Sequence, residues 1–101
     1  MNLKLLTQNF LEKSKFKYKK IIKITDYNFE ECILINSLSS DYTMILDNLR
    51  LIITITGSKG AHLVKVANEK KVTICRVNES FFNRLATEGN FEIDINSLNL
   101  S

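Results

Sequence analysis

The sequence predicts an α/β domain with a mainly parallel central sheet, and two observations lead to this prediction. Two continuous apolar runs, Glu31–Asn36 and Leu51–Thr56, are typical of strands buried on both faces, as in parallel sheets. The second run is followed by a segment with helical periodicity, Ala61–Lys70, and then by a further strand pattern at Val72–Val77. Alternation of strands and helices predicts parallel strands joined by helical crossovers.

The size and composition of the chain favour a single globular domain over residues 1–101. Of its 101 residues, 45% are hydrophobic and 25% are charged, which argues against disorder. No apolar run reaches the roughly 20 residues of a membrane span, and Met1–Leu6 is too short for a signal peptide. We therefore expect a cytoplasmic protein without membrane contact. Cys32 and Cys75 have no metal-ligand spacing, and we expect both to be free thiols. A disulfide between them is the alternative.

The N-terminal third contains a predicted helix and a predicted strand region. The apolar spacing of Leu3–Lys13 suits a short amphipathic helix, so we expect a helical extension over residues 1–15. Alternation of apolar residues and lysines from Phe16 to Ile24 predicts one or two strands with a register break near Lys20–Ile21. A turn at Thr25–Asn28 then leads into the first buried strand.

Two further helical segments are predicted outside the central helix. After a polar loop, Asp41 is expected to cap a helix that runs to about Asn48. The residues expected on its inner face are Met44, Ile45 and Leu49. Ser80 is expected to cap a short helical turn that carries Phe81, Phe82 and Leu85.

The last predicted element is a strand at the C-terminal end of the chain. Gly89 and Asn90 predict a turn. Phe91, Ile93 and Ile95 alternate after it, as in a final strand.

The net charge is only +3, but six lysines lie in one short stretch. Its members are Lys13, Lys15, Lys17, Lys19, Lys20 and Lys23. We interpret this stretch as the solvated face of an edge strand, where lysines discourage aggregation. The alternative is a nucleic-acid-binding or membrane-surface patch, and against the first the stretch contains no arginine.

His62 is the only histidine, and its context suits phosphate chemistry. It follows a buried-type strand and the loop Gly57-Ser58-Lys59-Gly60, and it lies in the first turn of the predicted helix. A helix N-terminus favours anions such as phosphate, and glycines let backbone amides approach closely. A positive helix end also favours neutral imidazole, the nucleophilic form. A lone histidine at a helix start is nevertheless more often a structural or surface residue.

The segment Thr54–Glu69 resembles the phosphohistidine motif of pyruvate phosphate dikinase, phosphoenolpyruvate synthase and enzyme I of the sugar phosphotransferase system. In that family a strand ending in Thr leads to a Gly-Gly loop, Thr-Ser-His and a helix with Ala-Arg-Glu. The matching positions here are Thr54, Gly57, His62, Ala67 and Glu69. The resemblance covers about residues 30–96 and implies a swivelling β/β/α domain with a mainly parallel sheet.

The resemblance implies a phosphocarrier with His62 as the phosphoacceptor and the Gly57–Ala61 loop as the phosphate-binding segment. The individual phosphate-binding positions are Gly57, Ser58, Lys59, Gly60 and Ala61. The chain has no P-loop and no evident carboxylate set for Mg²⁺. Mg²⁺ and ATP or phosphoenolpyruvate are therefore expected in partner domains, in cis or in trans, and this domain alone holds neither a cofactor nor a metal. A nucleotide-binding partner would load the histidine, and a pyruvate-type acceptor site would unload it.

The sequence departs from the family pattern near the histidine, and this keeps a second function open. Gly60 and Ala61 replace the family's Thr-Ser, Ser58 replaces its second glycine, and Asn68 replaces the helix arginine. Ser58 or Lys59 would then supply phosphate contacts. The alternative is a non-catalytic interaction or regulatory domain with a vestigial His62. An exposed ring favours the carrier, and a packed ring favours the alternative.

The remaining polar residues carry weaker signals. Asp26, Glu30, Glu31 and Asp47 form no recognisable acid–base pair or metal set. Cys32 and Cys75 are each interpreted as small core residues with no base at readable spacing.

Overall fold

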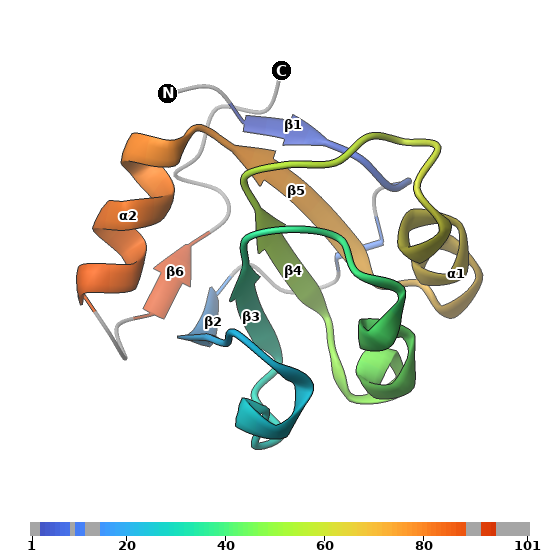
Figure 1. The fold of residues 1–101 in the computed structure, drawn as a ribbon, viewed down its shortest axis with the longest axis horizontal. Helices are drawn as coiled ribbons and strands as arrows, with labels where there is room; N and C mark the ends of the chain where they lie inside the picture. The colour runs from blue at the N-terminus through green and yellow to red at the C-terminus, as the bar shows by residue number, and fades with distance from the viewer. Residues whose placement is uncertain (1–2, 9, 12–14, 89–91, 95–101) are drawn as a thin grey trace.

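The chain folds around a mixed sheet with strand order β1-β5-β4-β3-β2-β6 (Figure 1). The computed structural model describes residues 3–8, 10–11, 15–88 and 92–94. The strands are β1 (Leu3–Leu5), β2 (Lys15–Lys20), β3 (Cys32–Ile35), β4 (Leu51–Thr54), β5 (Thr73–Val77) and β6 (Glu92–Asp94). Strands β2, β3, β4 and β5 are parallel, and β1 and β6 add antiparallel strands at the two edges. The predicted α/β class with a mainly parallel sheet is confirmed.

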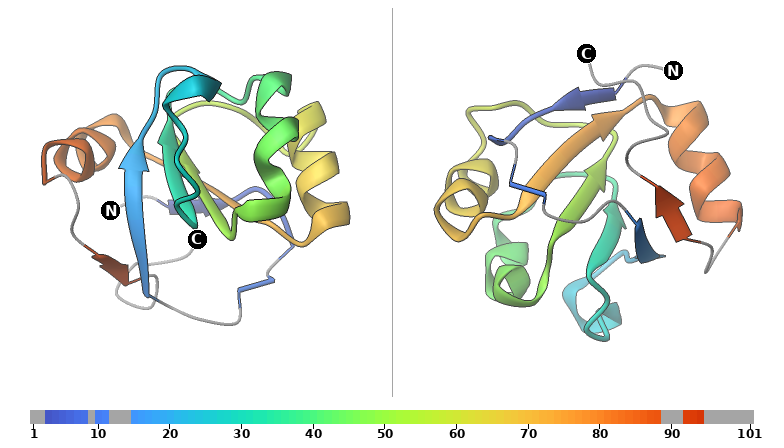
Figure 2. Two further views of the ribbon diagram at one scale, coloured as in Figure 1. Left: turned by 90° about the horizontal axis from the view of Figure 1, so that it is seen from below. Right: turned by 180° about the vertical axis from the view of Figure 1, so that it is seen from behind.

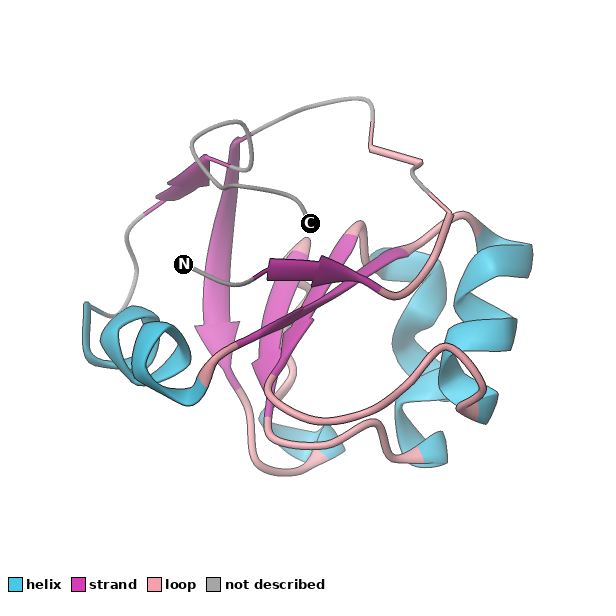
Figure 3. Cartoon of the chain, turned by 90° about the horizontal axis from the view of Figure 1, so that it is seen from above, coloured by secondary structure: helices cyan, strands magenta, loops and turns pink. Residues whose placement is uncertain are grey.

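Helical segments cover both faces of the sheet, as the view from above shows (Figure 3). They are the 3₁₀ helices η1 (Ile24–Asp26) and η2 (Ser40–Asn48) and the α-helices α1 (His62–Lys70) and α2 (Glu79–Glu88). Helices η2 and α1 lie on one face and α2 lies on the other (Figures 2 and 3). Within the described ranges, no helix combines the length and apolar character that crossing a bilayer requires.

The continuous apolar runs are explained by two cores, one on each face of the sheet. Side chains alternate between the faces of a strand, so Cys32 and Leu34 enter the core beneath α2. Ile33 and Ile35 enter the core beneath η2 and α1. Every residue of β3 and β4 is buried as a result.

The predicted central architecture is confirmed in its pairing and packing. The register aligns Ile33 with Ile52 and Ile52 with Ile74 across the three central strands. Helix α1 packs on this face through Val64 and Ala67, which are almost completely buried. Helix α1 begins one residue after the predicted start and ends at the predicted Lys70.

The predicted N-terminal helix is wrong for the first described residues, which form β1 along β5. Leu3 is buried in the core under α2, whereas Leu6 is buried in the core under α1, so the two leucines lie on opposite faces of the sheet. A helix would have placed them on one side. Strand β1 satisfies the otherwise open edge of β5, and Leu6 N continues the pairing with Ile74 O at 2.8 Å. Of the predicted extension over 1–15, residues 1–2, 9 and 12–14 lie outside the described residues.

Strand β2 ends at Lys20, where the register break was predicted. The expected continuation of the strand through Ile22 and Ile24 is wrong. The chain instead turns at η1, where the Asp26 carboxylate accepts hydrogen bonds from Ile22 N and Lys23 N, both at 3.1 Å. Two short-range backbone contacts to one carboxylate favour a turn over a second strand.

The lysines of β2 lie on a solvated face, but β2 is not an edge strand. Phe16 and Tyr18 are buried, and Lys15, Lys17 and Lys19 between and beside them are exposed. Strand β6 pairs with β2 on the side away from β3. The solvated face is therefore confirmed and the edge position is wrong. Lys13 lies outside the described residues.

The predicted segment at 41–48 is helical, but its cap and part of its inner face differ from the prediction. Ser39 caps η2 by accepting a hydrogen bond from Asp41 N at 3.3 Å. Tyr42 and Leu46 are buried, Ile45 is partly buried against the same core, and Leu49 is buried just after the helix. The inner positions of Ile45 and Leu49 are therefore confirmed, whereas that of Met44 is wrong, since its side chain is 80% exposed.

Helix α2 is longer than the predicted helical turn. Asn78 caps it through Oδ1, which accepts from Phe81 N at 2.8 Å, so Ser80 is not the cap. Strand β6 lies within the predicted final strand. The predicted turn at Gly89–Asn90 and the strand positions Phe91 and Ile95 lie outside the described residues.

Candidate functional site

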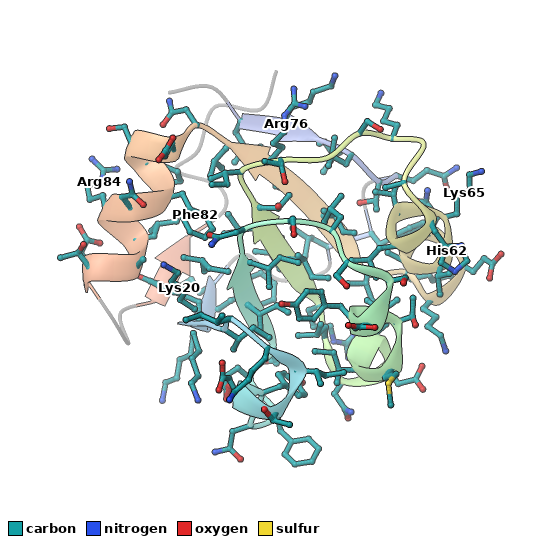
Figure 4. The ribbon with its side chains drawn as sticks, viewed as in Figure 1. Lys20, His62, Lys65, Arg76, Phe82 and Arg84 are labelled. Carbon is teal, nitrogen blue, oxygen red and sulfur yellow. The ribbon has the colours of Figure 1, made fainter. Side chains whose placement is uncertain are left out.

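His62 is the first residue of α1, and its ring is exposed (Figure 4). The helix starts here because Ala61 has extended backbone angles (φ −62°, ψ 144°) while its carbonyl accepts from the amides of Val64 and Lys65. The His62 ring has no hydrogen-bond partner among the described residues. The predicted exposed position in the first helical turn is confirmed, and the ring is free to meet another molecule.

The start of α1 keeps two amides available. The amides of His62 and Leu63 donate to no acceptor in the described part of the chain. The first amides of any helix have no intrahelical partner, and they carry the positive end of its dipole. An anion on the ring of His62 therefore meets favourable backbone dipoles.

The chain that leads from β4 to His62 is tied down by side-chain hydrogen bonds at its beginning. The Thr54 hydroxyl donates to Thr56 O at 3.0 Å, and the Thr56 hydroxyl donates to Asn36 O at 2.8 Å. The Arg76 guanidinium on β5 donates to Gly57 O at 2.8 Å. These bonds attach the first part of the loop to Asn36, just after β3, and to Arg76 of β5. The loop is therefore held by both strands that flank β4.

Gly57 is the one glycine of the loop that the backbone demands. Its φ is 114°, a backbone conformation that residues with a side chain rarely adopt, and an added Cβ would collide with the side chain of Leu38. Gly60 has no such conformation, and the nearest atom to an added Cβ would be Ser58 Oγ at 3.9 Å. The two glycines therefore have different roles, although the sequence suggests the same one.

The predicted phosphate-binding residues are brought together only in part. Ser58, Lys59 and Gly60 are exposed in the turn just before His62. The Ala61 amide donates to Ser58 O at 3.1 Å, so in this conformation it closes the turn and is not offered to a ligand. Ser58 and Lys59 keep the polar groups that face solvent beside the histidine.

Two residues that bear on this site were not identified from the sequence. Arg76 carries no local signal, because its bond to Gly57 joins residues 19 positions apart. Lys65 does carry one, since it lies three residues after His62 and is exposed on the same side of α1. Both are labelled in Figure 4, where Lys65 lies beside His62 on α1 and Arg76 lies on β5.

Asn68, which stands where the family has an arginine, has a structural contact here. Its Oδ1 accepts a hydrogen bond from Gln8 N at 2.8 Å. Thr7 Oγ1 accepts from Ile74 N at 2.9 Å in the same segment. The side chain of Asn68 therefore fastens the chain after β1 to helix α1.

The cysteines are core residues that do not reach one another. In the register of the sheet, Cys32 of β3 lies opposite Leu51 of β4, and Leu51 lies opposite Thr73 of β5. Cys75 lies two residues after Thr73 on β5. Two strand spacings and two residue rises separate them by roughly 12 Å, and a disulfide needs Cα atoms within about 7 Å. Burial raises the pKa of the Cys75 thiol to about 12. Burial, and to a smaller extent Cys75, also raises the pKa of Cys32, so neither thiol is an activated nucleophile.

The acidic candidates are engaged in separate local contacts. Asp26 accepts amides around η1, and Glu30 Oε1 accepts from Asn28 N at 3.2 Å. The Glu31 carboxylate lies 3.9 Å from Arg50 Nε, and Asp47 pairs with Lys70 at 2.7 Å. Among the described residues, no three side chains of the metal-ligating types gather in one place.

No family model matches this chain, and the search of curated proteins finds no similar one.

Proposed function

We propose that the chain is a phosphocarrier domain of the swivelling β/β/α type, which accepts a phosphoryl group on His62. It would carry this group from a nucleotide-binding partner site to an acceptor site of the pyruvate or phosphoenolpyruvate type. The observation that carries the proposal is the position of the ring. The only histidine of the chain is exposed at the first residue of α1, beyond the end of a parallel strand and behind a tethered glycine loop.

The proposed reaction is a nucleophilic substitution at phosphorus, once when His62 is loaded and once when it is unloaded. The unprotonated ring nitrogen of His62 attacks the phosphoryl group in line, and the bond from phosphorus to the donor oxygen breaks. The other ring nitrogen loses its proton to solvent or to a partner base, which leaves a neutral ring that bears the phosphoryl group. In the second transfer an acceptor oxygen attacks phosphorus, and the bond to the ring nitrogen breaks. Neutralisation of the donor by Mg²⁺ falls to the partner.

Exposure of the ring distinguishes a carrier from an ordinary catalytic histidine. A carrier group must enter two different sites in turn, so it cannot be packed within its own domain. His62 meets this requirement, because no described residue bonds to its ring. The amides of His62 and Leu63 offer charge-assisted hydrogen bonds to the phosphoryl oxygens.

A second candidate function is a non-catalytic interaction domain with a vestigial His62. The observation in its favour is the exposure of three large apolar side chains, Ile22 at 80%, Phe29 at 74% and Met44 at 80%. Apolar side chains exposed singly are common on monomers, and they indicate an interface only when they form a continuous patch. We therefore place this candidate second.

The test is phosphorylation of the wild-type chain and of His62→Ala by its nucleotide-binding partner. The partner is first shown to be active on its own, and a donor labelled in the transferred phosphoryl group is added. The carrier predicts acid-labile, base-stable label on the wild type and none on the variant. A suitable control is Lys70→Gln, at the other end of α1, which should be labelled like the wild type. Equal labelling of wild type and His62→Ala, or none on either, would reject the carrier and leave the interaction domain as the leading account.

A further inference from the structure

A single lysine stands beside the histidine on the exposed side of α1. His62, Lys65 and Glu69 are exposed, whereas Leu63, Val64 and Ala67 are buried against the sheet (Figure 4). Residues three apart on a helix are neighbours, with Cβ atoms about 5–6 Å apart. The ammonium group of Lys65 is therefore within side-chain reach of any group attached to the ring of His62.

The Lys65 ammonium has no anionic partner within the described ranges. Among the described residues it takes part in no ion pair and no hydrogen bond. Lys70, on the same helix, contrasts with it, because its Nζ lies 2.7 Å from Asp47 Oδ1. One lysine of α1 is thus committed to a carboxylate of the same chain, and the lysine next to the histidine is not.

The geometry of the helix directs Lys65 toward the histidine. Long side chains on an α-helix lean toward its N-terminus. The Lys65 side chain is therefore expected to lean toward His62 and away from Glu69, which lies one turn further along. A Lys-to-Glu order at this spacing is also the less favourable orientation for an ion pair. These two effects keep the ammonium available on the side of the ring.

We propose that Lys65 is a further phosphate-contacting residue of the site, with its ammonium neutralising a phosphoryl group on the ring of His62. This inference rests on the proposed carrier function. A phosphoryl group brings up to two negative charges, and the two positions directly before the ring, Gly60 and Ala61, carry no side-chain donor. Lysine suits this role, since its flexible stem lets a point charge follow a group that moves between two sites.

The test loads the ring chemically, so it does not depend on any partner protein. Potassium phosphoramidate is the probe: a nitrogen of the imidazole attacks phosphorus, the bond from phosphorus to the amine breaks, and the departing ammonia takes up the proton that the ring loses. The loaded protein is then titrated, and the ³¹P chemical shift reports the pKa of the bound phosphoryl group. The proteins are the wild type, Lys65→Gln, Lys65→Arg and the matched control Lys70→Gln, each checked for native folding by circular dichroism.

A nearby ammonium stabilises the dianion, so its removal raises the pKa of the phosphoryl group. For two charges about 6 Å apart in a water-like medium, the expected rise in Lys65→Gln is about 0.5. Lys65→Arg restores the wild-type value, and Lys70→Gln leaves it unchanged. The difference between wild type and Lys65→Gln shrinks as ionic strength rises, because the charges are exposed.

Equal values in wild type and Lys65→Gln, or an equal rise in Lys70→Gln, would overturn the assignment. A wild-type ring that takes no phosphoryl group from phosphoramidate would overturn it as well. Failure of the carrier function has a different signature: the ring is loaded by phosphoramidate and the Lys65 effect is present, yet the nucleotide-binding partner transfers no label.

Discussion

The guanidinium of Arg76 donates a hydrogen bond to the carbonyl oxygen of Gly57 at 2.8 Å, which joins β5 to the loop that leads to His62. Arg76 is only partly exposed, and its backbone lies in register with Thr54 of β4 and Lys4 of β1. The bond therefore crosses from one central strand to the chain that leaves its neighbour. It fixes the loop at the residue with positive φ.

Substitution of Arg76 by Met is expected to loosen this loop. The loss of a charge-assisted hydrogen bond to a partly buried carbonyl should lower the free energy of unfolding by about 1–3 kcal/mol. Amide hydrogen exchange should accelerate in the Gly57–Ala61 segment while β3 stays protected. Arg84→Met is the control, because Arg84 is exposed and stacks over Phe81 at 5.0 Å from the ring centroid. Similar exchange in the loop of both variants would contradict the assigned role.

Alanine at the two loop glycines should have unequal effects. Gly57→Ala combines an unfavourable φ with a clash against Leu38, so it is expected to cost about 1–3 kcal/mol or more. Gly60→Ala meets only an ordinary van der Waals contact with Ser58 Oγ and has no left-handed φ, so it should change stability by less than about 1 kcal/mol. Urea denaturation of the two variants measures the difference. If both were equally stable, the loop would have a different conformation.

Charge reversal at Lys15 or Lys17 is expected to leave folding almost unchanged. Both side chains are exposed, and the register places them opposite Asp94 and Glu92 of β6. Cross-strand charge pairs contribute roughly 0.2–1 kcal/mol, so a loss above about 1 kcal/mol per site would show that the stretch is packed. Phe16→Ala, between them and buried, should cost about 3–5 kcal/mol and sets the scale in the same thermal unfolding experiment.

Alkaline pH is expected to destabilise the protein through its buried thiols. The pKa of Cys75 is raised to about 12 in the folded chain, whereas unfolded thiols ionise near pH 8.5, at about their ordinary pKa. The unfolded state thus releases a proton that the folded state retains. The contribution of Cys75 to stability is fully present below about pH 8.5 and declines by about 1.4 kcal/mol per pH unit up to pH 12. The slope of unfolding free energy against pH should be shallower in Cys75→Ala, and an unchanged slope would contradict the buried thiol.

Much of the fold was predictable because periodicity is a local property. The apolar runs of β3 and β4 and the helical pattern of α1 each depend on residues close together in the chain, and all three elements appear where the pattern predicts them. The exposed His62 in the first turn of α1 was predictable for the same reason, because a helix start can be read from its immediate neighbours.

The wrong prediction of an N-terminal helix concerns residues whose partner is distant in sequence. The segment Leu3–Lys13 has apolar spacing that suits a helix, but the open edge of β5, some 70 residues further along, offers a pairing partner to Leu3–Leu5. In η2, Tyr42 is buried in the core under α1 and its hydroxyl donates to Ile22 O at 3.4 Å, 20 positions away, whereas Met44 is exposed.

The same division applies to the candidate site. The order of residues alone determined a strand, a glycine loop and a histidine at the start of a helix, because each follows from local conformational preference. Only the tertiary structure decided that Arg76 holds Gly57 O and that Asn68 holds Gln8 N. Each contact joins a side chain to a backbone group, 19 positions apart in the first and 60 in the second. The packing of the sheet brings these groups together, and no local pattern encodes that approach.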